Sequence, residues 1–382
     1  MEIVGGAYRE LCEIPYWDAE FGSGGRAAAA VSTLSPNCVF HTYARNPNSS
    51  GLNFLRSLRV DVRPHLSSES IAFAYFHPLS RPHIEPPLSK IAQQPPIHVA
   101  ASTVLRFGLL EGEAVVRADR AIYDPQTSNS PQPFHANGST AKSLALIVNE
   151  NELRAFTNSL DCDEAAGQVI RAQNIDVLIV KAGARGAQVF DASGRKTHVS
   201  AYRSSKVFKI GTGDVFSAVF AHYWGEKKIP AHEAAILASQ SVSKYCSDAI
   251  LPPKLSSTDQ FIEIGNSLKG PILLEGCADT LGSRYVMEEA RFHLQELGAT
   301  VVCPVLEITN QEHYPASVLI ISDGLSTESY QRINSKNISV PTVIFCEEAP
   351  MQALKNRPWT RSHILCGEFV TAIYFSVWAA ME

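Results

Sequence analysis

The sequence predicts an α/β protein whose core is a mainly parallel β-sheet. Short apolar runs, typical of buried strands, alternate along the chain with segments whose apolar residues recur every three or four positions, as in amphipathic helices. Parallel strands are joined by crossover helices, which cover both faces of the sheet. The composition agrees with this class of globular protein, because 45% of the residues are hydrophobic and 19% are charged.

Most of the alternating elements lie before residue 265. Apolar runs bounded by turn residues predict strands at 1–6, 37–44, 70–77, 96–102, 114–125, 143–149 and 176–183. Helical periodicity predicts helices at 22–34, 151–160, 164–174 and 231–247, and another that begins near residue 211. Residues 186–202 have the pattern of a β-hairpin. Together these elements predict one large α/β domain over residues 1–265.

A second, smaller domain is expected at 270–382. The Pro- and Ser-containing stretch LPPKLSS at 251–257 interrupts the pattern, and a short polar helix is expected after it. A new strand then begins at Pro271, followed by a helix at 283–298. Further strands at 299–304, 317–324 and 340–347 and a final helix at 367–381 complete a Rossmann-like α/β unit.

Charge and cysteine content exclude several classes of protein. A net charge of −5 gives no reason to expect nucleic acid or an anionic membrane as a partner, and no apolar run reaches the length of a membrane span. The N-terminus lacks a signal peptide, so we expect a cytoplasmic protein. The eight cysteines are scattered and form no C-x-x-C pair, which argues against a zinc site and against a disulfide framework.

The segment KIGTGDVFSAVFAHYW at 209–224 carries the strongest chemical signal. Its apolar residues follow one face of a helix, so Gly211-Thr212-Gly213-Asp214 lies on the first turn of a buried helix. Free backbone N–H groups and the helix dipole favour an anion there, and glycines let it approach closely. An acidic side chain among these N–H groups would repel the anion unless Asp214 had a chemical role.

This pattern, late in a large α/β domain, resembles the C-terminal signature of the ribokinase-like (PfkB) family of sugar and nucleoside kinases. The resemblance implies that Asp214 removes the proton from the attacking hydroxyl group, while Gly211, Thr212 and Gly213 form an anion hole for the transferred phosphoryl group. It also implies a three-layer α/β/α fold with a small β lid, for which the β-rich segments at 8–20 and 69–85 are the candidates.

Other motifs match the same family in the same order. Asn149-x-x-Glu152 resembles its N-x-x-E motif, which implies that both residues organise Mg²⁺ and the nucleotide phosphates, with Glu152 as the metal ligand. The segment VLIVKAGARGAQVFD at 177–191 resembles the strand and hairpin beside the nucleotide. Its candidate cofactor-binding residues are Lys181, Gly183 and Gly186. IYDPQ at 122–126 resembles the Asp-Pro strand end of the family.

The side of the site expected to bind the acceptor departs from the family pattern. GSGGRAA at 22–28 resembles the paired-glycine segment near the acceptor, which implicates Gly24 and Gly25. Glu10 stands where the family usually has an Asp that binds sugar hydroxyls. An Asn expected shortly after the glycines is absent, and Phe208 and Lys209 replace the usual Asp-Thr ahead of the signature. We therefore expect an altered acceptor pocket.

The leading hypothesis is an enzyme that uses ATP and Mg²⁺ to phosphorylate a hydroxyl of a sugar or nucleoside. A homodimer is left open. One alternative is a non-catalytic regulator that binds a nucleoside or sugar phosphate. Another is a nucleoside-processing enzyme that acts through the C-terminal domain, which loosely resembles the nucleoside 2-deoxyribosyltransferase-like fold, with Glu328 as nucleophile.

Each motif also has a purely structural explanation. The GTGD segment can be an ordinary helix start, since an acidic residue is favourable in a first turn. Asn149 can simply cap a solvated helix, and GSGGRAA can be only a turn. Lys209 can be a solvated lysine or a cation beside the phosphates.

Overall fold

The computed structural model describes residues 1–157, 159–307, 314–335, 340–347 and 363–382, which form two compact units. The first unit comprises Met1–Ala182 and Gly186–Ile262, and the second comprises Gly183–Arg185 and Glu263–Glu382. Whether the chain divides into folding domains at 1–265 and 270–382 stays a prediction. No helix of the described residues combines the length and apolarity needed to cross a bilayer.

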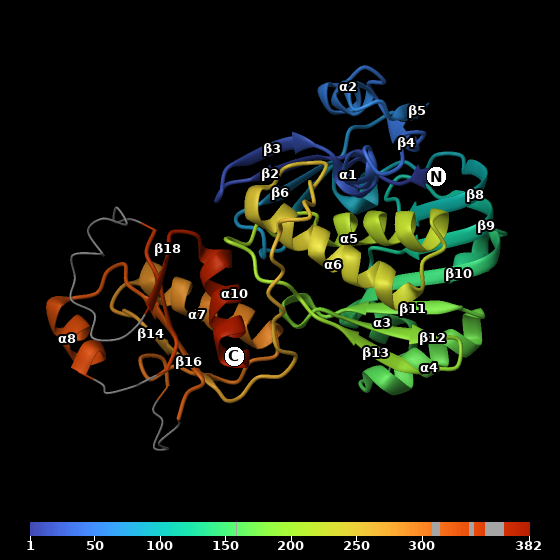
Figure 1. Ribbon diagram of the computed structural model, residues 1–382. Helices are drawn as coiled ribbons and strands as arrows, with labels where there is room; N and C mark the ends of the chain where they lie inside the picture. The colour runs from blue at the N-terminus through green and yellow to red at the C-terminus, as the bar shows by residue number, and fades with distance from the viewer. Residues whose placement is uncertain (158, 308–313, 336–339, 348–362) are drawn as a thin grey trace. The chain divides into compact units, whose positions relative to one another are not determined.

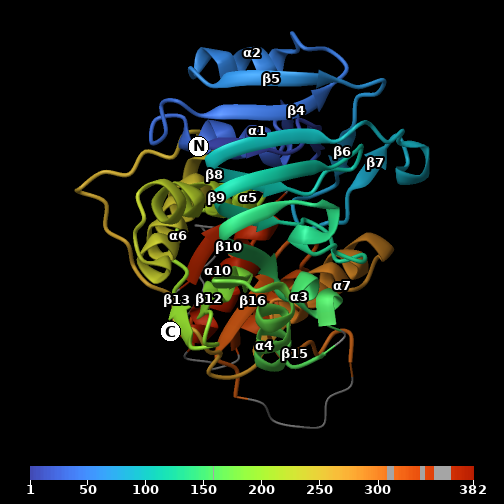
Figure 2. The same ribbon diagram turned by 90° about the vertical axis from the view of Figure 1, so that its right-hand side faces the viewer.

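A nine-stranded sheet forms the centre of the first unit, which confirms the predicted α/β class. Its strand order is β13-β12-β11-β10-β9-β8-β1-β4-β5. In this order, every neighbouring pair from β11 to β5 is parallel, whereas β12 pairs antiparallel with both β11 and β13. Figure 2 shows β4, β8, β9 and β10 side by side. In chain order the strands are β1 (Glu2–Val4), β4 (Val39–Ala44), β5 (Asp61–Leu66), β8 (Ile97–Phe107), β9 (Ala114–Asp124), β10 (Thr140–Asn149), β11 (Val177–Lys181), β12 (Ala187–Asp191) and β13 (Lys196–Val199).

Helices cover both faces of this sheet, as the unbroken apolar character of its strands predicts. Alternate strand residues such as Ile3 and Leu105 join one apolar cluster, and their neighbours Val4 and Val104 join another. The first cluster includes helices α1 (Gly22–Val31), α2 (Ser50–Ser57), α5 (Thr212–Phe220) and α6 (Ala231–Asp248), of which α1, α5 and α6 are prominent in Figure 1. The second includes α3 (Glu150–Thr157) and α4 (Cys162–Gln173). The unit is therefore the predicted three-layer sandwich.

The strand order changes direction at β1. The chain runs outward from β1 to β4 and β5, then returns to the other side of β1 with β8. Ligands of open α/β sheets bind at such a switch point, outside the carboxyl ends of the strands. The residues at this edge include Gly5 after β1, Asp124 at the end of β9, Asn149 at the end of β10 and Lys181 at the end of β11. Several of the predicted site residues therefore share one edge.

A separate four-stranded sheet forms where the β-rich lid segments were expected. Its order is β3-β2-β6-β7, and its strands are β2 (Arg9–Cys12), β3 (Trp17–Glu20), β6 (Ala72–Tyr75) and β7 (His83–Glu85). Glu10 is the second residue of β2. We call this sheet the lid sheet.

The second unit is the smaller α/β sheet that the sequence predicts. Five parallel strands follow the order β15-β14-β16-β17-β18, an order common in doubly wound folds. The strands are β14 (Ile272–Glu275), β15 (Val301–Val302), β16 (Ser317–Ile321), β17 (Thr342–Phe345) and β18 (His363–Cys366), and the helices are α7 (Leu281–Glu296), α8 (Thr327–Ser335) and α10 (Phe369–Met381). The expected polar helix after residue 257 is not formed, because residues 258–268 make turns and extended segments.

Candidate active site

The first turn of α5 is shaped around a glycine. Gly211 is the N-cap residue and has a left-handed conformation, with φ of 71°. A Cβ atom at this position would lie 2.0 Å from Nε of Arg26, so any larger residue would collide with that side chain. Among the hydrogen bonds of the described residues, none involves the N–H of Gly213, which remains available to an anion. The N–H of Thr212, in contrast, is donated to the carbonyl oxygen of Lys209 at 3.4 Å, and the anion hole stays a prediction.

Asp214 lies buried two residues into α5. Its side chain is engaged on both oxygens: Gln126 donates from Nε2 to Oδ1 at 2.6 Å, and Arg26 donates from Nη1 to Oδ2 at 3.4 Å. Burial raises the pKa of Asp214 to about 6, even though the Arg26 charge opposes the shift. A carboxylate with a pKa near neutrality can accept a proton from a hydroxyl group more readily than an exposed aspartate.

Arg26 of α1 is fully buried and binds three different elements. Its guanidinium binds both carboxylate oxygens of Glu10, with 2.8 Å from Nη1 to Oε1, and Nη2 donates to Oε2. Nε donates to the hydroxyl of Tyr245 in α6 at 3.1 Å. The structure therefore brings the predicted acceptor-binding residue Glu10 near Asp214, but pairs the Glu10 carboxylate with Arg26.

The paired glycines place α1 against the turn that follows β1. The N–H groups of Gly24 and Gly25 lie 3.1 and 3.3 Å from the carbonyl oxygen of Gly6. A Cβ on Gly24 would lie 2.8 Å from Cα of Gly5, so a side chain would force helix and turn apart. This close packing brings Arg26, in the first turn of α1, to the start of α5. The packing explains Gly24, whereas a Cβ on Gly25 would come no closer than 3.6 Å to Leu55, an ordinary contact. The proposed contact of both glycines with an acceptor stays a prediction.

Lys181 and Asp124 form a buried ion pair on the other side of Asp214. Lys181 donates from Nζ to Oδ2 of Asp124 at 2.8 Å, and Ser217 donates to the same oxygen at 2.7 Å. Burial disfavours the Lys181 charge, but Asp124 and Glu152 outweigh it and raise the pKa of Lys181. A Cβ on Gly213 would lie 3.4 Å from this ammonium group. Lys181 is therefore a fixed cation beside the predicted anion hole.

Asn149 and Glu152 form a reciprocal capping box at the start of α3. The N–H of Asn149 donates to Oε2 of Glu152 at 2.8 Å, and the N–H of Glu152 donates to Oδ1 of Asn149 at 2.9 Å. Asn149 therefore caps α3, as the purely structural explanation of this motif states. Burial, together with the charge of Asp124, raises the pKa of Glu152 to about 7. A cation near this carboxylate would restore its ionised form.

The remaining predicted residues contact their own loops. Lys209 donates to the Thr212 hydroxyl at 2.9 Å, and burial lowers the pKa of Lys209. It is therefore not a solvated lysine. Gly186 has φ of 81°, and a Cβ there would lie 2.1 Å from the carbonyl oxygen of Val199, which explains the glycine by backbone packing. Gly183 groups with the second unit, and its nucleotide contact stays a prediction.

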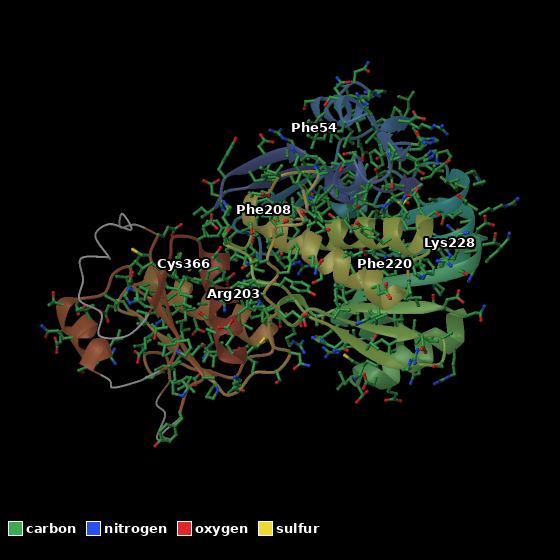
Figure 3. The ribbon with its side chains drawn as sticks, in the orientation of Figure 1. Phe54, Arg203, Phe208, Phe220, Lys228 and Cys366 are labelled. Atoms are coloured by element: carbon green, nitrogen blue, oxygen red, sulfur yellow. The ribbon has the colours of Figure 1, made fainter. Side chains whose placement is uncertain are left out.

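Two labelled residues in Figure 3 lie before and after α5 along the chain. Phe208 lies ahead of α5 and packs against Trp17 of the lid sheet, with 4.8 Å between ring centroids. Lys228 follows the π-helical turn Ala221–Glu226, beside an open cavity of about 530 Å³. The charged groups of that cavity are largely paired, since Lys142 binds Asp119 at 2.7 Å. The cavity is lined by Ser102, Thr103, Asp119, Arg120, Lys142, Ser143, Gly225, Glu226 and Lys228.

Sequence reasoning missed four residues of the site. Arg26, Gln126 and Tyr245 contact Asp214 or its partner, and Asp124 holds Lys181. One signal was present: Arg26 is the single charged residue in a helix of otherwise small or apolar residues, and it could not be expected to be buried without a partner. Asp124 lies in the IYDPQ segment, which resembles a family motif but did not by itself indicate a site residue.

The sequence model of the pfkB family of carbohydrate kinases matches residues 114–245. No curated protein matches the chain in sequence. Among solved structures, the chain is similar to ribokinase of Arabidopsis thaliana complexed with ribose and ATP, with 15% identity over 64% of this chain and 91% of that chain and a TM-score of 0.49. It is also similar to adenosine kinase from Sinorhizobium meliloti, with 14% identity over 67% and 96% of the two chains and a TM-score of 0.46. The stretch matched by the family model includes Asp124, Glu152, Lys181 and Asp214, and ends before Glu263, where the main part of the second unit begins.

Proposed function

We propose that the first unit is a kinase that transfers the terminal phosphoryl group of ATP to a hydroxyl group of a sugar or nucleoside. The observation that carries this proposal is the environment of Asp214. The carboxylate is buried, has a pKa raised to about 6, and lies on the first turn of α5 beside an available N–H group. This turn falls within the stretch that carries the carbohydrate-kinase sequence pattern.

The residues divide the chemistry between base and anion hole. Asp214 takes the proton of the acceptor hydroxyl as the oxygen attacks phosphorus. The N–H groups of Gly211 and Gly213 and the ammonium group of Lys181 stabilise the negative charge on the transferred group, while the N–H of Thr212 is donated to the carbonyl oxygen of Lys209. Asp214 and Lys181 both act from buried positions, where an electrostatic interaction is stronger than in water. The lid sheet would exclude water from the transferred phosphoryl group.

The residues near Lys181 also fit a magnesium ion. Oδ1 of Asp124 is buried and has no hydrogen-bond partner among the described residues, and Glu152 places a second carboxylate near it. Carboxylate oxygens are the ligands that Mg²⁺ prefers, with waters and phosphates completing its shell. Glu152 and Asp124 would hold the ion, which when bound neutralises charge on the nucleotide phosphates.

ADP release over a panel of sugars and nucleosides tests the proposal. With ATP and Mg²⁺ present, at least one neutral polyhydroxy acceptor should give ADP above the rate seen without acceptor. Glu152→Gln should raise the Mg²⁺ concentration needed for half-maximal activity while leaving the cap of α3 in place, because glutamine also forms a capping box. Absence of ADP release with every acceptor, despite ATP binding, would overturn the proposal.

A non-catalytic binding protein is the second candidate, and one observation favours it. Both oxygens of Asp214 are already engaged, by Gln126 and by Arg26. A protein of this kind would gain thermal stability with a sugar phosphate or nucleoside and would release no ADP.

The third alternative is a nucleoside-processing enzyme with Glu328 as nucleophile. Glu328 is exposed in the first turn of α8, and nothing among the described residues around it favours a nucleophile.

A further inference from the structure

We infer that Arg26 is a positioning residue that couples the lid sheet to the base: by binding Glu10 of β2 and Asp214 of α5 at once, it makes the basicity of Asp214 depend on whether Glu10 is docked. The inference rests on the proposed role of Asp214 as base. It gives Glu10 a role different from the acceptor binding that the family resemblance implies.

The geometry shows one cation shared between two carboxylates. Nη1 of Arg26 lies 2.8 Å from Oε1 of Glu10 and 3.4 Å from Oδ2 of Asp214. Glu10 receives both guanidinium nitrogens, whereas Asp214 receives one at a longer distance. With Glu10 docked, Arg26 therefore stabilises the ionised form of Asp214 only weakly.

Arg26 cannot turn away from this position. Its Nε donates to Tyr245, and the hydroxyl of Tyr245 donates in turn to the carbonyl oxygen of Ile210 at 3.0 Å. The side chain passes over Gly211, where a Cβ would lie 2.0 Å from Nε. The side chain of Arg26 is fully buried. Glu10 comes from the lid sheet, so it is the partner whose docking varies in this inference.

Among the described residues, Arg26 is the cation that lies within ion-pair distance of Asp214. Lys181 is held by Asp124, and Lys209 donates to Thr212. The charged, titratable and hydrogen-bonding groups that face Asp214 are Glu10 of β2, Arg26 of α1, Tyr75 of β6, Asp124 of β9, Gln126 after β9, Glu152 of α3, Lys181 of β11, Lys209 ahead of α5 and Tyr245 of α6.

Withdrawal of Glu10 changes the base in a defined direction. Arg26 then faces Asp214 alone, and the like charge of Glu10 is gone, so both changes favour the ionised carboxylate and lower its pKa. Docking of Glu10 reverses both effects and makes Asp214 a stronger base. The carboxylate would thus activate a hydroxyl group most strongly when the lid sheet is docked, which limits activation of water in an open site.

Titration of the Asp214 carboxylate tests this coupling without any assay of activity. The ¹³C carboxyl signal of Asp214, assigned by its loss in Asp214→Asn, is followed against pH in the full chain. Glu10→Gln should lower the titration midpoint by about one unit or more, and Arg26→Gln should raise it by a similar amount. Asp18→Asn is the matched control, because Asp18 is an exposed carboxylate of the same lid sheet, paired with Arg9; its midpoint should equal that of the wild type.

Opposite shifts in the two variants support the coupling, since a merely structural role would not reverse sign. An unchanged or raised midpoint in Glu10→Gln overturns it. If Arg26→Gln fails to fold, Tyr245→Phe replaces it and should shift the midpoint by freeing Nε of Arg26 to move. Failure of the proposed function is seen separately, as absence of ADP release by the wild type, whatever the midpoints are.

Discussion

At the scale of single residues, Asp214 is where chemistry and stability conflict. Its pKa is raised from 3.8 to about 6, so ionising this carboxylate costs more in the folded protein than in the unfolded chain. A difference of about two units corresponds to about 3 kcal/mol at pH 7. A residue kept for its packing would not carry such a cost, whereas a base with a pKa close to the working pH gains from it.

Asp214→Asn should therefore separate the two roles. The free energy of unfolding at pH 7 should stay equal or rise, by at most about 3 kcal/mol, because the buried charge is removed. Phosphoryl transfer should fall by about 10² to 10⁴, the usual contribution of a general base, while ATP still binds. Thermal denaturation and ADP release measure the two effects. Asp119→Asn, at an exposed position paired with Lys142, is the control and should change neither.

Asp214 was predictable from the sequence, and Arg26 was not, for a physical reason. The glycine turn and the amphipathic helix that place Asp214 lie within sixteen residues of chain. Arg26 meets Asp214 across 188 positions, and Glu10 and Tyr245 across 16 and 219. These contacts depend on how α1 packs against β1 and α5, which no local pattern specifies. The stretch matched by the family model also excludes Arg26 and Glu10.

At the scale of elements, the close packing of α1 against the start of α5 decides which residues can stand at their contact. Gly24 lets α1 approach the turn after β1, and Gly211 leaves space for the side chain of Arg26. Both glycines occur in motifs that the sequence singled out for ligand binding. The structure shows that close packing alone also requires them, so a glycine motif by itself does not distinguish a ligand site from a packed turn.

Gly211→Ala should destabilise the protein more than a positive φ alone explains. Gly194 provides the control, because its φ of 82° is similar and a Cβ there would meet nothing within 4 Å. Gly194→Ala should cost about 1 kcal/mol for the left-handed conformation. Gly211→Ala adds a collision with Arg26, so its cost should exceed the control by at least about 1 kcal/mol. Urea unfolding of both variants gives the difference, and equal costs would show that Arg26 can move aside.

Strands were predicted better than the segment that joins the two units. The parallel strands are apolar on both faces, which makes them visible as continuous runs. A short polar helix was expected after residue 257, but the carbonyl oxygen of Ile262 accepts a hydrogen bond from the N–H of Arg203 at 2.9 Å. The backbone there pairs with a distant segment instead of with itself, which a local pattern could not indicate.

At the scale of the whole molecule, the buried acids make stability depend on pH. Folding raises the pKa of Asp214 to about 6 and that of Glu152 from 4.5 to about 7. An acid of this kind stabilises the folded state below its unfolded-state pKa, and the stabilisation is lost as the pH rises through the folded-state pKa. Glu226 acts oppositely, because hydrogen bonds from His222 and the N-terminus outweigh its burial and lower its pKa to about 2.

The first unit should therefore be more stable near pH 5 than at pH 7.5. Below about pH 4.5 the stability should fall again, as Glu226 and other paired carboxylates take up protons. Thermal denaturation between pH 4 and 8 measures the curve, and the double variant Asp214→Asn with Glu152→Gln should flatten its neutral side. A melting temperature that rises steadily from pH 5 to pH 8 would contradict the inferred burial of the two acids.

The division of the chain into two units predicts that a protein ending at residue 265 folds without the rest. The two large apolar clusters of the first unit draw their members from residues 1–251, and Asn149, Lys181 and Asp214 all precede the proposed boundary. The shortened protein should unfold in one cooperative transition. It should also gain about 2.7 kcal/mol of stability when ATP is present at 100 times its Kd, the same gain that we expect for the full chain. An insoluble fragment beside a soluble full chain would show that the units share a core. A folded fragment that no longer responds to ATP would show that residues after 265 are needed for nucleotide binding, because the fragment keeps the segment Gly183–Arg185, which groups with the second unit.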